Sequence, residues 1–504
     1  MVSRVYTVSF LGLKVEEVEV QVHIGDGLPA FFIVGLANKA VAESKERIRS
    51  AFISMGLSLP AKRITVNLAP ADLNKEGSHY DLPIAVALLV EMQIISQEEI
   101  ENYVILGEVS LSSSINKVAG ILPAAIWTNS KNKGLVCPYD NSQEVGWSGN
   151  EDVITAKNII EIVNHFTGKQ DIPKIIKKDP NVELKKYPNL KDVKGQQAAK
   201  RALEIAAAGR HNMIMVGPPG SGKSMLAKRL AGIIPEMTMD EILETSVIAS
   251  LSGTLEEQGL ITNRPFRSPH CNASLPSMIG GGKLAKPGEI TLSHLGVLFL
   301  DELPEFQKNV LESLRQPIED RNVTISRVNN HISYPANFQL VAAMNPCKCG
   351  YYGDSNLQCN RAPKCVDDYK NKISGPLFDR FDIQIEVPEI NAMELENIKE
   401  GEDSEIVLKR VVIASEIQLK RYSESSISNN AELEGQELNQ HIALDSKSKE
   451  ILNTAMKKFK FSMRGMNKIL KVARTIADLE QTNNVNHFHI AEAVGYRVKS
   501  LKCN

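Results

Sequence analysis

The segment GPPGSGKS, residues 217–224, restricts the fold of this chain more than any other feature. An apolar run, MIMV, precedes it, and a helix-like run, MLAKRLAG, follows it. Glycines in such a loop let backbone N–H groups converge on phosphate oxygens, while a lysine reaches the β- and γ-phosphates and a hydroxyl reaches Mg²⁺. We therefore predict a parallel α/β core that binds ATP and Mg²⁺ through Gly217, Pro218, Pro219, Gly220, Ser221, Gly222, Lys223 and Ser224.

Two acidic residues follow another apolar run, in GVLFLDELPEF. The run VLFL predicts a buried strand that delivers Asp301 and Glu302 to its carboxyl end, where ligands bind in parallel sheets. We predict that Asp301 holds Mg²⁺ together with Ser224, and that Glu302 orients or deprotonates the attacking water. The alternative is a helix cap. A position about eighty residues beyond the glycine loop favours the catalytic interpretation.

Three further polar residues complete the predicted catalytic group. Asn345 ends the apolar run FQLVAAM, where an amide can hydrogen-bond the γ-phosphate and the attacking water. Arg380, in SGPLFDRFDI, fits an arginine offered to the ATP of a neighbouring subunit; its alternative is a salt bridge with Asp379 or Asp382. Arg464, in FSMRGMNKILK, fits a lid residue that reaches the phosphates; its alternative is a solvated arginine at a helix start.

Periodicity and composition predict how the chain is divided. Strand-like runs such as VYTVSF, VEVQVHI, FFIVGL and RITVNLA give the first part an α/β pattern, and a Lys- and Pro-rich stretch without an apolar stripe follows it as a linker. We predict four parts: an α/β domain over 1–168, a linker over 169–191, the nucleotide-binding core over 192–390 and a helical lid over 391–504. Within the lid, the Ser- and Asn-rich stretch 421–438 is predicted to be a soft boundary or a mobile loop, and 448–480 to be helical throughout.

Together these motifs resemble an AAA+ ATPase, and two insertions narrow the resemblance. More than seventy residues separate the glycine loop from GVLFLDE, and DRNVTISRVNNHISYPANF predicts a β-hairpin ahead of Asn345. Both are typical of the subgroup that contains the magnesium-chelatase motor subunit and the MCM helicases. RPFRSPHCNAS, GEITLSHLGVLFLDELPEF, AAMNPC and LKVARTIADLE are similar to motifs of the ComM/YifB family of bacterial chelatase-like ATPases, over nearly the whole chain.

The first part of the chain resembles the domain of Lon-type serine–lysine proteases, in NKEGSHYDLPIAVAL and LGEVSLSSSINKVAGILPAAI. Ser78 lies one residue before the expected serine position, which His79 occupies. Ala124 stands nearest to the expected lysine, and Lys117 lies upstream of it. Because a serine nucleophile needs its base, we predict a Lon-like domain that is not a protease. Similar domains without catalytic residues occur in RadA, where they form a ring-building, DNA-binding platform.

Four of the seven cysteines lie close together: Cys347, Cys349, Cys359 and Cys365. Four thiolates suit tetrahedral Zn²⁺, and clustered cysteines without a regular framework are not typical of secreted disulfides. The spacing is irregular, with one residue inside the first pair and five inside the second. Structural zinc and reduced loop thiols both remain as interpretations.

The formal net charge is only −2, so any nucleic-acid contact must come from local basic groups or from a ring of subunits. No apolar run approaches a membrane span, and the N-terminus alternates like a strand, so we expect a cytoplasmic protein without a membrane partner.

The ComM/YifB resemblance implies a hexameric, homo-oligomeric ATPase that moves along branched or single-stranded DNA without sequence preference, as in branch migration during natural transformation. Candidate DNA contacts are Lys283, Lys286 and Arg327, with solvated surface charge as the alternative for each. The alternative function is an ATPase that remodels a protein partner, as the magnesium-chelatase motor does.

Overall fold

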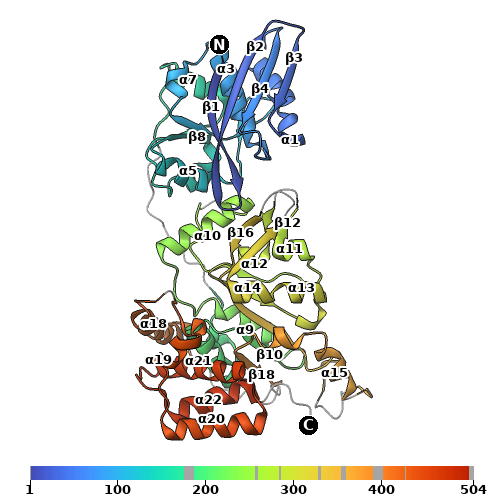
Figure 1. Cartoon of the computed structure of the whole chain (residues 1–504), viewed down its shortest axis with the longest axis vertical. Coiled ribbons are helices and arrows are strands. Elements are labelled where there is room, and N and C mark those ends of the chain that lie inside the picture. The colour runs from blue at the N-terminus through green and yellow to red at the C-terminus, as the bar shows by residue number, and fades with distance from the viewer. Residues whose placement is uncertain are drawn as a thin grey trace.

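A computed structural model gives the fold as an elongated arrangement of an N-terminal α/β domain, a central α/β core and a set of C-terminal helices (Figure 1). The structure describes residues 2–174, 187–255, 259–282, 285–326, 331–352, 359–361, 363–389, 401–425 and 427–498. In that part of the chain, every helix is too short or too polar to cross a bilayer.

The N-terminal domain is built on a seven-stranded mixed sheet of order β3-β4-β2-β1-β5-β8-β9. Its long strands β1 and β2 form an antiparallel hairpin, in which alternate valines of β2 are buried, as the alternation in the sequence predicts. The strands are β1 Ser3–Leu11, β2 Lys14–Gly25, β3 Ala30–Val34, β4 Arg63–Ala69, β5 Tyr103–Ile105, β8 Gly134–Pro138 and β9 Val153–Ala156. The main helices are α2 Ser44–Ser54, α3 Asp81–Glu91, α5 Ile121–Ser130 and α7 Ile159–Phe166.

The central core is a five-stranded sheet of order β11-β14-β17-β10-β18 in which every pair is parallel. The strands β10, β14 and β17 are buried throughout, which explains why they read as continuous apolar runs. The bounds are β10 Met213–Val216, β11 Phe266–Arg267, β14 Val297–Leu300, β17 Gln339–Met344 and β18 Ile383–Glu386. Helices α8 Gln197–Gly209 and α9 Lys223–Leu230 flank β10 in the sequence.

Both predicted insertions are present in the core. Between α9 and β14 the chain forms α10 Met239–Ser252, α11 Leu275–Ile279, the short strands β12 Gly280–Gly281 and β13 Lys286–Pro287, and α12 Glu289–Leu292. Ahead of β17, β15 Asn322–Ser326 pairs antiparallel with β16 His331–Pro335, which confirms the predicted hairpin. The predicted DNA contacts Lys283 and Arg327 lie outside the described residues, whereas Lys286 is exposed on β13.

The C-terminal part is helical, but its sequence pattern is misleading in two places. The bounds of its helices are α18 Ser404–Arg421, α19 Gly435–His441, α20 Ser446–Phe459, α21 Met463–Leu479 and α22 His487–Val498. The single helical stretch predicted over 448–480 is wrong, because Lys460 takes a left-handed backbone conformation with φ 51° and separates α20 from α21. The following Ser462 then caps α21 by accepting a hydrogen bond from the N–H of Gly465.

The stretch predicted as a boundary or mobile loop is instead packed into the helical domain over 427–438. Asn430 is fully buried, and its amide donates to the carboxylate of Asp478 at 2.8 Å and to the hydroxyl of Thr475 at 3.0 Å. Polar composition suggested exposure, but these side chains satisfy one another inside the fold. The predicted domain boundaries themselves stay predictions, although Tyr187 and Leu190, at the end of the predicted linker, already contact the core.

The N-terminal domain meets the core through the tip of the β1–β2 hairpin and through α5. Leu13 packs against the apolar cluster that contains Ile332 of β16, and a Cβ on Gly12 would come within 2.5 Å of that isoleucine. At the start of α5, the N–H of Gly120 donates to the carbonyl of Ser250 on α10 at 3.0 Å. The two domains therefore touch at the predicted insertions of the core, as Figure 1 shows for β1, α5 and α10.

Candidate active site at the carboxyl edge of the core sheet

The glycine loop follows the carboxyl end of β10 and leads directly into α9. Gly220 and Gly222 have φ of 79° and 88°, the region that glycine adopts without strain, and a Cβ there would meet nothing within 4 Å. Gly217 is required for a different reason, because its Cβ would lie 2.1 Å from the carbonyl oxygen of Val387. The sequence therefore builds an open loop over the buried end of the sheet, which is the shape a phosphate chain needs.

The Lys223 ammonium lies inside this loop. It donates to the carbonyl groups of Gly217 at 2.7 Å and Pro218 at 2.8 Å, and to the amide oxygen of Asn345 at 3.2 Å. Burial lowers the pKa of Lys223, while the nearby carboxylates of Asp301 and Glu302 act in the opposite direction. The predicted phosphate-binding lysine and the predicted sensing amide are therefore in direct contact, although they are far apart in sequence.

Ser224 and Asp301 converge in the same place. The Ser224 hydroxyl donates to the Asp301 carboxylate at 2.6 Å, across the junction between α9 and the end of β14. Hydroxyl and carboxylate oxygens are the hard ligands that Mg²⁺ prefers, and the ion keeps several waters besides them. These two side chains fit the predicted Mg²⁺ site.

Glu302 stands beside this pair in an unusual backbone conformation. Its φ is 51° and its ψ 47°, which costs free energy for a residue with a side chain and persists only where the surroundings impose it. The Asp301 carboxylate contributes, since it accepts a hydrogen bond from the N–H of Glu302 at 2.9 Å. The Glu302 side chain is exposed at the edge of the site, as a group that acts on water must be.

Arg380 lies at the other end of the sheet. It comes just before β18, and β18 runs parallel to β10 with Ile383 beside Met213 and Glu386 beside Val216. Arg380 is therefore at the amino edge, whereas the glycine loop begins after Val216 at the carboxyl edge. Four strand residues at about 3.3 Å each separate the two edges.

The ion-pair partner of Arg380 is Glu319, not Asp379 or Asp382 as the alternative interpretation proposed. The carbonyl of Pro376 accepts a second hydrogen bond from its guanidinium at 2.7 Å. The Arg380 side chain is 10% exposed and that of Glu319 is 54% exposed, so the pair lies at the rim of solvent.

Arg464 lines the same surface cleft as Arg380, at the start of α21. This cleft has a volume of about 540 Å³ and contains no residue of the glycine loop. One turn further along α21, Lys468 makes a salt bridge of 2.6 Å with Asp382, which fixes the helix to the amino edge of the sheet. Burial alone would raise the pKa of Asp382, but Lys468 and His211 hold it well below its usual range.

Neither arginine therefore lies with the glycine loop of its own chain. Arg464 was predicted to reach phosphates from a lid, which stays a prediction; within its own chain it lines the same cleft as Arg380.

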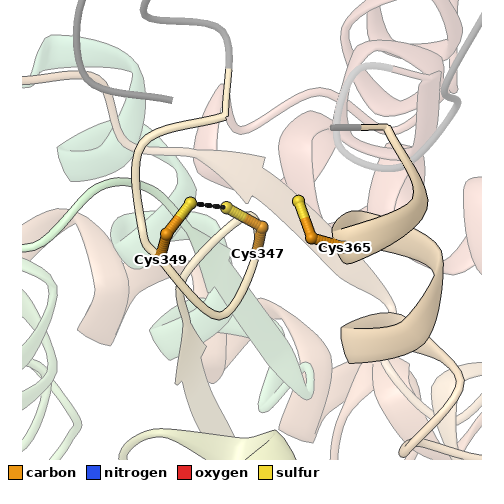
Figure 2. Close-up of side chains that lie close together, drawn as sticks. All are labelled: Cys347, Cys349 and Cys365. Carbon is orange, nitrogen blue, oxygen red and sulfur yellow. Dashed lines mark hydrogen bonds between the residues drawn. The ribbon is translucent and has the colours of Figure 1, made fainter. Parts of the chain in front are cut away.

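The four clustered cysteines come together next to the site. Cys347 and Cys349 lie in the turn after β17, with their sulfurs 3.0 Å apart, and Cys365 lies beside them on α15 Lys364–Lys370 (Figure 2). The sulfurs of these three residues are all within 4.8 Å of one another, and that of Cys359 is 3.4 Å from Cys365. A soft, four-sulfur set of this kind fits Zn²⁺.

The protonation of these thiols differs among them. Hydrogen bonds from the Cys347 thiol and from backbone N–H groups lower the pKa of Cys349 to about 6, whereas burial raises that of Cys365 to about 12.

The predicted remnant of a protease site lies in a cleft between the N-terminal domain and the core. Ser78, His79 and Lys117 line it, and Ala124 is buried on α5. The imidazole of His79 hydrogen-bonds the carbonyl of Val8 at 3.0 Å, and burial lowers its pKa to about 4, so the ring is neutral. His79 is thus a packed core residue.

Two contributors to the site escaped the sequence analysis. Gln196 donates from its amide to the carbonyl of Pro388 at 2.6 Å and to that of Ser221 at 3.5 Å, so it connects the loop to the segment after β18. Gly350 packs on Pro219, since a Cβ there would lie 2.7 Å from the proline ring. The contacts of Gln196 with Pro388 and of Gly350 with Pro219 each join residues more than a hundred positions apart, which local patterns do not reveal.

Comparison with known proteins identifies the family of this chain. The magnesium chelatase subunit ChlI family matches residues 189–395, with further matches of a ChlI family at 20–141 and of its C-terminal family at 401–497. The chain is 41% identical to "Competence protein ComM" of Haemophilus influenzae over 98% of this chain and 97% of that protein. This chain belongs to the ComM/YifB family.

Two further relatives are similar to nearly the whole chain and to a part of it, respectively. "Uncharacterized protein YifB" of Salmonella typhimurium is also 41% identical, over 98% of this chain and 96% of that protein. "Lon protease 2" of Bacillus subtilis is 28% identical over 33% of this chain and 34% of that protein. As a ComM/YifB member with a magnesium-chelatase-like AAA+ core, the chain is an ATPase that uses a nucleotide and Mg²⁺.

Proposed function

We propose that this ATPase assembles into a ring, a hexamer by its resemblance, and uses ATP hydrolysis in the cytoplasm to move along branched or single-stranded DNA. The observation that carries the proposal is the position of Arg380 at the opposite edge of the sheet from Lys223. An arginine there cannot serve the nucleotide of its own chain. It fits the nucleotide of the next subunit in a ring.

Each side chain then has a defined part in hydrolysis. The glycine loop and Lys223 would hold the phosphates, and Ser224 and Asp301, which already lie in hydrogen-bond contact, would hold Mg²⁺. When bound, the metal would neutralise charge on the phosphate oxygens. Glu302 accepts a proton from the attacking water, Asn345 orients that water against the γ-phosphate, and Arg380 of a neighbour stabilises the charge that develops in the transition state.

Nucleotide state can be passed from Asn345 toward the DNA-facing parts. Asn345 follows β17, and β17 follows the β15–β16 hairpin in the chain. That hairpin contacts the N-terminal domain through Ile332 and Gly12. A shift of Asn345 toward the γ-phosphate would therefore be transmitted to the hairpin and from there to the N-terminal domain. Such transmission supports coupling of hydrolysis to movement of a bound strand.

A second function is favoured by one observation. All three matched segments belong to magnesium-chelatase families, and a chelatase-type ATPase acts on a protein partner. The name of the Haemophilus relative refers to competence, which favours DNA as the substrate. Proteolysis is the weakest alternative, because no hydrogen bond joins Ser78 to Lys117 among the described residues.

The test is to measure the ATPase rate with a four-way junction, with single-stranded DNA and without DNA, each at two salt concentrations, with reduced casein as a protein control. Stimulation by DNA that weakens at higher salt is expected, since phosphate contacts release counterions. A rate indifferent to every DNA while casein stimulates it or is cut would refute the proposal.

A further inference from the structure

The cleft between the N-terminal domain and the core is an unassigned cavity of about 360 Å³. This volume is within the range of roughly 300–1,000 Å³ in which proteins bind small ligands. One wall is formed by the tip of β1, the Ser78 turn and residues 117–119, and the other by β13, β16 and the end of α10. The cleft therefore opens where the two domains meet, along the same β16 that carries the predicted DNA hairpin.

The charges in this cleft favour an anion. Lys117 contributes an ammonium group from the N-terminal wall and Lys286 one from the core wall, and both residues are exposed. Within the described part of the chain, neither lysine has a carboxylate within salt-bridge distance. One carboxylate, that of Glu76, also lines the cleft. Buried Glu144, close enough to Lys117 to interact with its charge, is engaged by the amide of Asn141.

An aromatic group lines the same cleft as these charges. Phe10 is half-buried in the cleft, at the tip of β1, and its ring centroid is 5.8 Å from that of His79. Gly120 also packs against the ring, since a Cβ there would lie 2.7 Å from it. A ring held in this way is a rigid apolar platform, and cationic grooves that contain such rings are how proteins bind single strands without reading sequence.

We propose that this cleft holds one nucleotide of a single DNA strand, with its base against Phe10 and its backbone phosphate between Lys117 and Lys286. The inference rests on the proposed function and specifies where the strand passes. The turn that resembles the Lon serine turn would then be part of a nucleic-acid path, since Ser78 lines the same cleft as Lys117 and Lys286. Movement of β16 during hydrolysis would shift one wall of the cleft against the other.

The test uses the full chain and an oligo-dT strand, with the binding constant measured by fluorescence anisotropy over a salt series. One neutralised phosphate contributes about 0.7 to the slope of log K against log salt for single strands. The Lys117→Ala/Lys286→Ala variant should lose about that much. The matched control is Lys131→Ala/Lys308→Ala, two exposed lysines on the same two domains that do not line the cleft, and it should keep the wild-type slope.

A second variant separates stacking from charge. Phe10→Leu keeps the apolar contact with Gly120 but removes the ring, so oligo-dT should bind about tenfold more weakly with an unchanged salt slope. Thermal unfolding of each variant establishes that it is folded.

Wild-type-like slopes and affinity in both cleft variants, with DNA still bound, would overturn the inference and leave the proposed function standing. The absence of DNA binding by the wild-type chain at low salt would refute both. Competition by reduced casein that depends on Lys117 and Lys286 would show a peptide site instead.

Discussion

The Lys223 ammonium donates to the carbonyl groups of its own loop, and Ser224 donates to Asp301. Nucleotide and metal must replace these internal hydrogen bonds, so each binding step exchanges one set of polar contacts for another. Such exchange keeps the buried groups satisfied in both states, which avoids the cost of an unpaired buried ammonium.

Separate variants distinguish binding from hydrolysis at this site. Lys223→Ala should abolish nucleotide binding, because it removes the charge that faces the phosphates. Glu302→Gln should retain binding and lose about 10²–10⁴-fold in hydrolysis, the usual contribution of a general base. Nucleotide binding is measured with a fluorescent ATP analogue and hydrolysis by phosphate release. Lys228→Ala, exposed on the same helix, is the matched control, and unchanged hydrolysis in both site variants would contradict the assignment.

Local sequence patterns were sufficient for the groups that a single turn or strand end positions. The glycine loop, Asp301 after β14 and Asn345 after β17 could all be predicted, because burial and strand direction alone bring them to one edge. Partners from distant segments could not be predicted. Glu319 precedes Arg380 by sixty-one residues, and nothing near either one identifies the other.

At the scale of elements, the turn that carries Cys347 and Cys349 connects three parts of the site. It begins two residues after Asn345, and Gly350 within it packs on Pro219 of the glycine loop. The chain then continues through α15 and α16 Gly375–Phe378 to Arg380. A metal bound by these cysteines would fix the distance between Asn345 and Arg380 of the same chain, because it would hold the segment that joins them. Arg380 is the residue proposed to act on the ATP of a neighbouring subunit.

Metal analysis tests the zinc interpretation directly. Purified protein should contain about one Zn²⁺ per chain, and the Cys347→Ser/Cys349→Ser variant should contain none. Removal of the metal by a chelator should lower the melting temperature, since ion binding contributes free energy only to the folded state. Cys271→Ser, outside the cluster, is the matched control. Metal-free protein of unchanged melting temperature would leave the cysteines as reduced thiols.

The lid helices show where element-level prediction fails. A left-handed Lys460 divides what the apolar periodicity presented as one helix, and lysine has no preference that marks such a site. The Ser- and Asn-rich stretch looked solvent-exposed because composition does not show that Asn430 and Asp478 would satisfy each other. In both places tertiary contacts override the local pattern.

At the scale of the whole molecule, Arg380 and Arg464 line one cleft and the glycine loop lies at the opposite edge of the sheet, so in the proposed ring the active site would be completed between chains. If every subunit of a closed ring has the glycine loop at one edge of its sheet and Arg380 at the other, each boundary between subunits would contain one composite site.

Mixed rings test this arrangement. Arg380→Ala should lower hydrolysis about 10³-fold or more, the lower end of the effect known for such arginines. Rings mixed from Arg380→Ala and Lys223→Ala chains should recover activity, because some boundaries then combine an intact loop with an intact arginine. Arg361→Ala, an exposed surface arginine, is the control and should behave as wild type. Failure to recover activity at every mixing ratio would argue against an arginine that acts on its neighbour.

The parallel order of the core sheet has a consequence for how this enzyme is switched on. If the proposed ring is correct, an isolated subunit would bind ATP at one edge of its sheet and carry at the other edge the arginine that acts on a neighbour's ATP, so it would bind nucleotide without hydrolysing it. Dilution alone should abolish ATP hydrolysis, and the hydrolysis rate per subunit should rise steeply with protein concentration. Any ligand that brings subunits together, a DNA strand included, would therefore activate ATP hydrolysis.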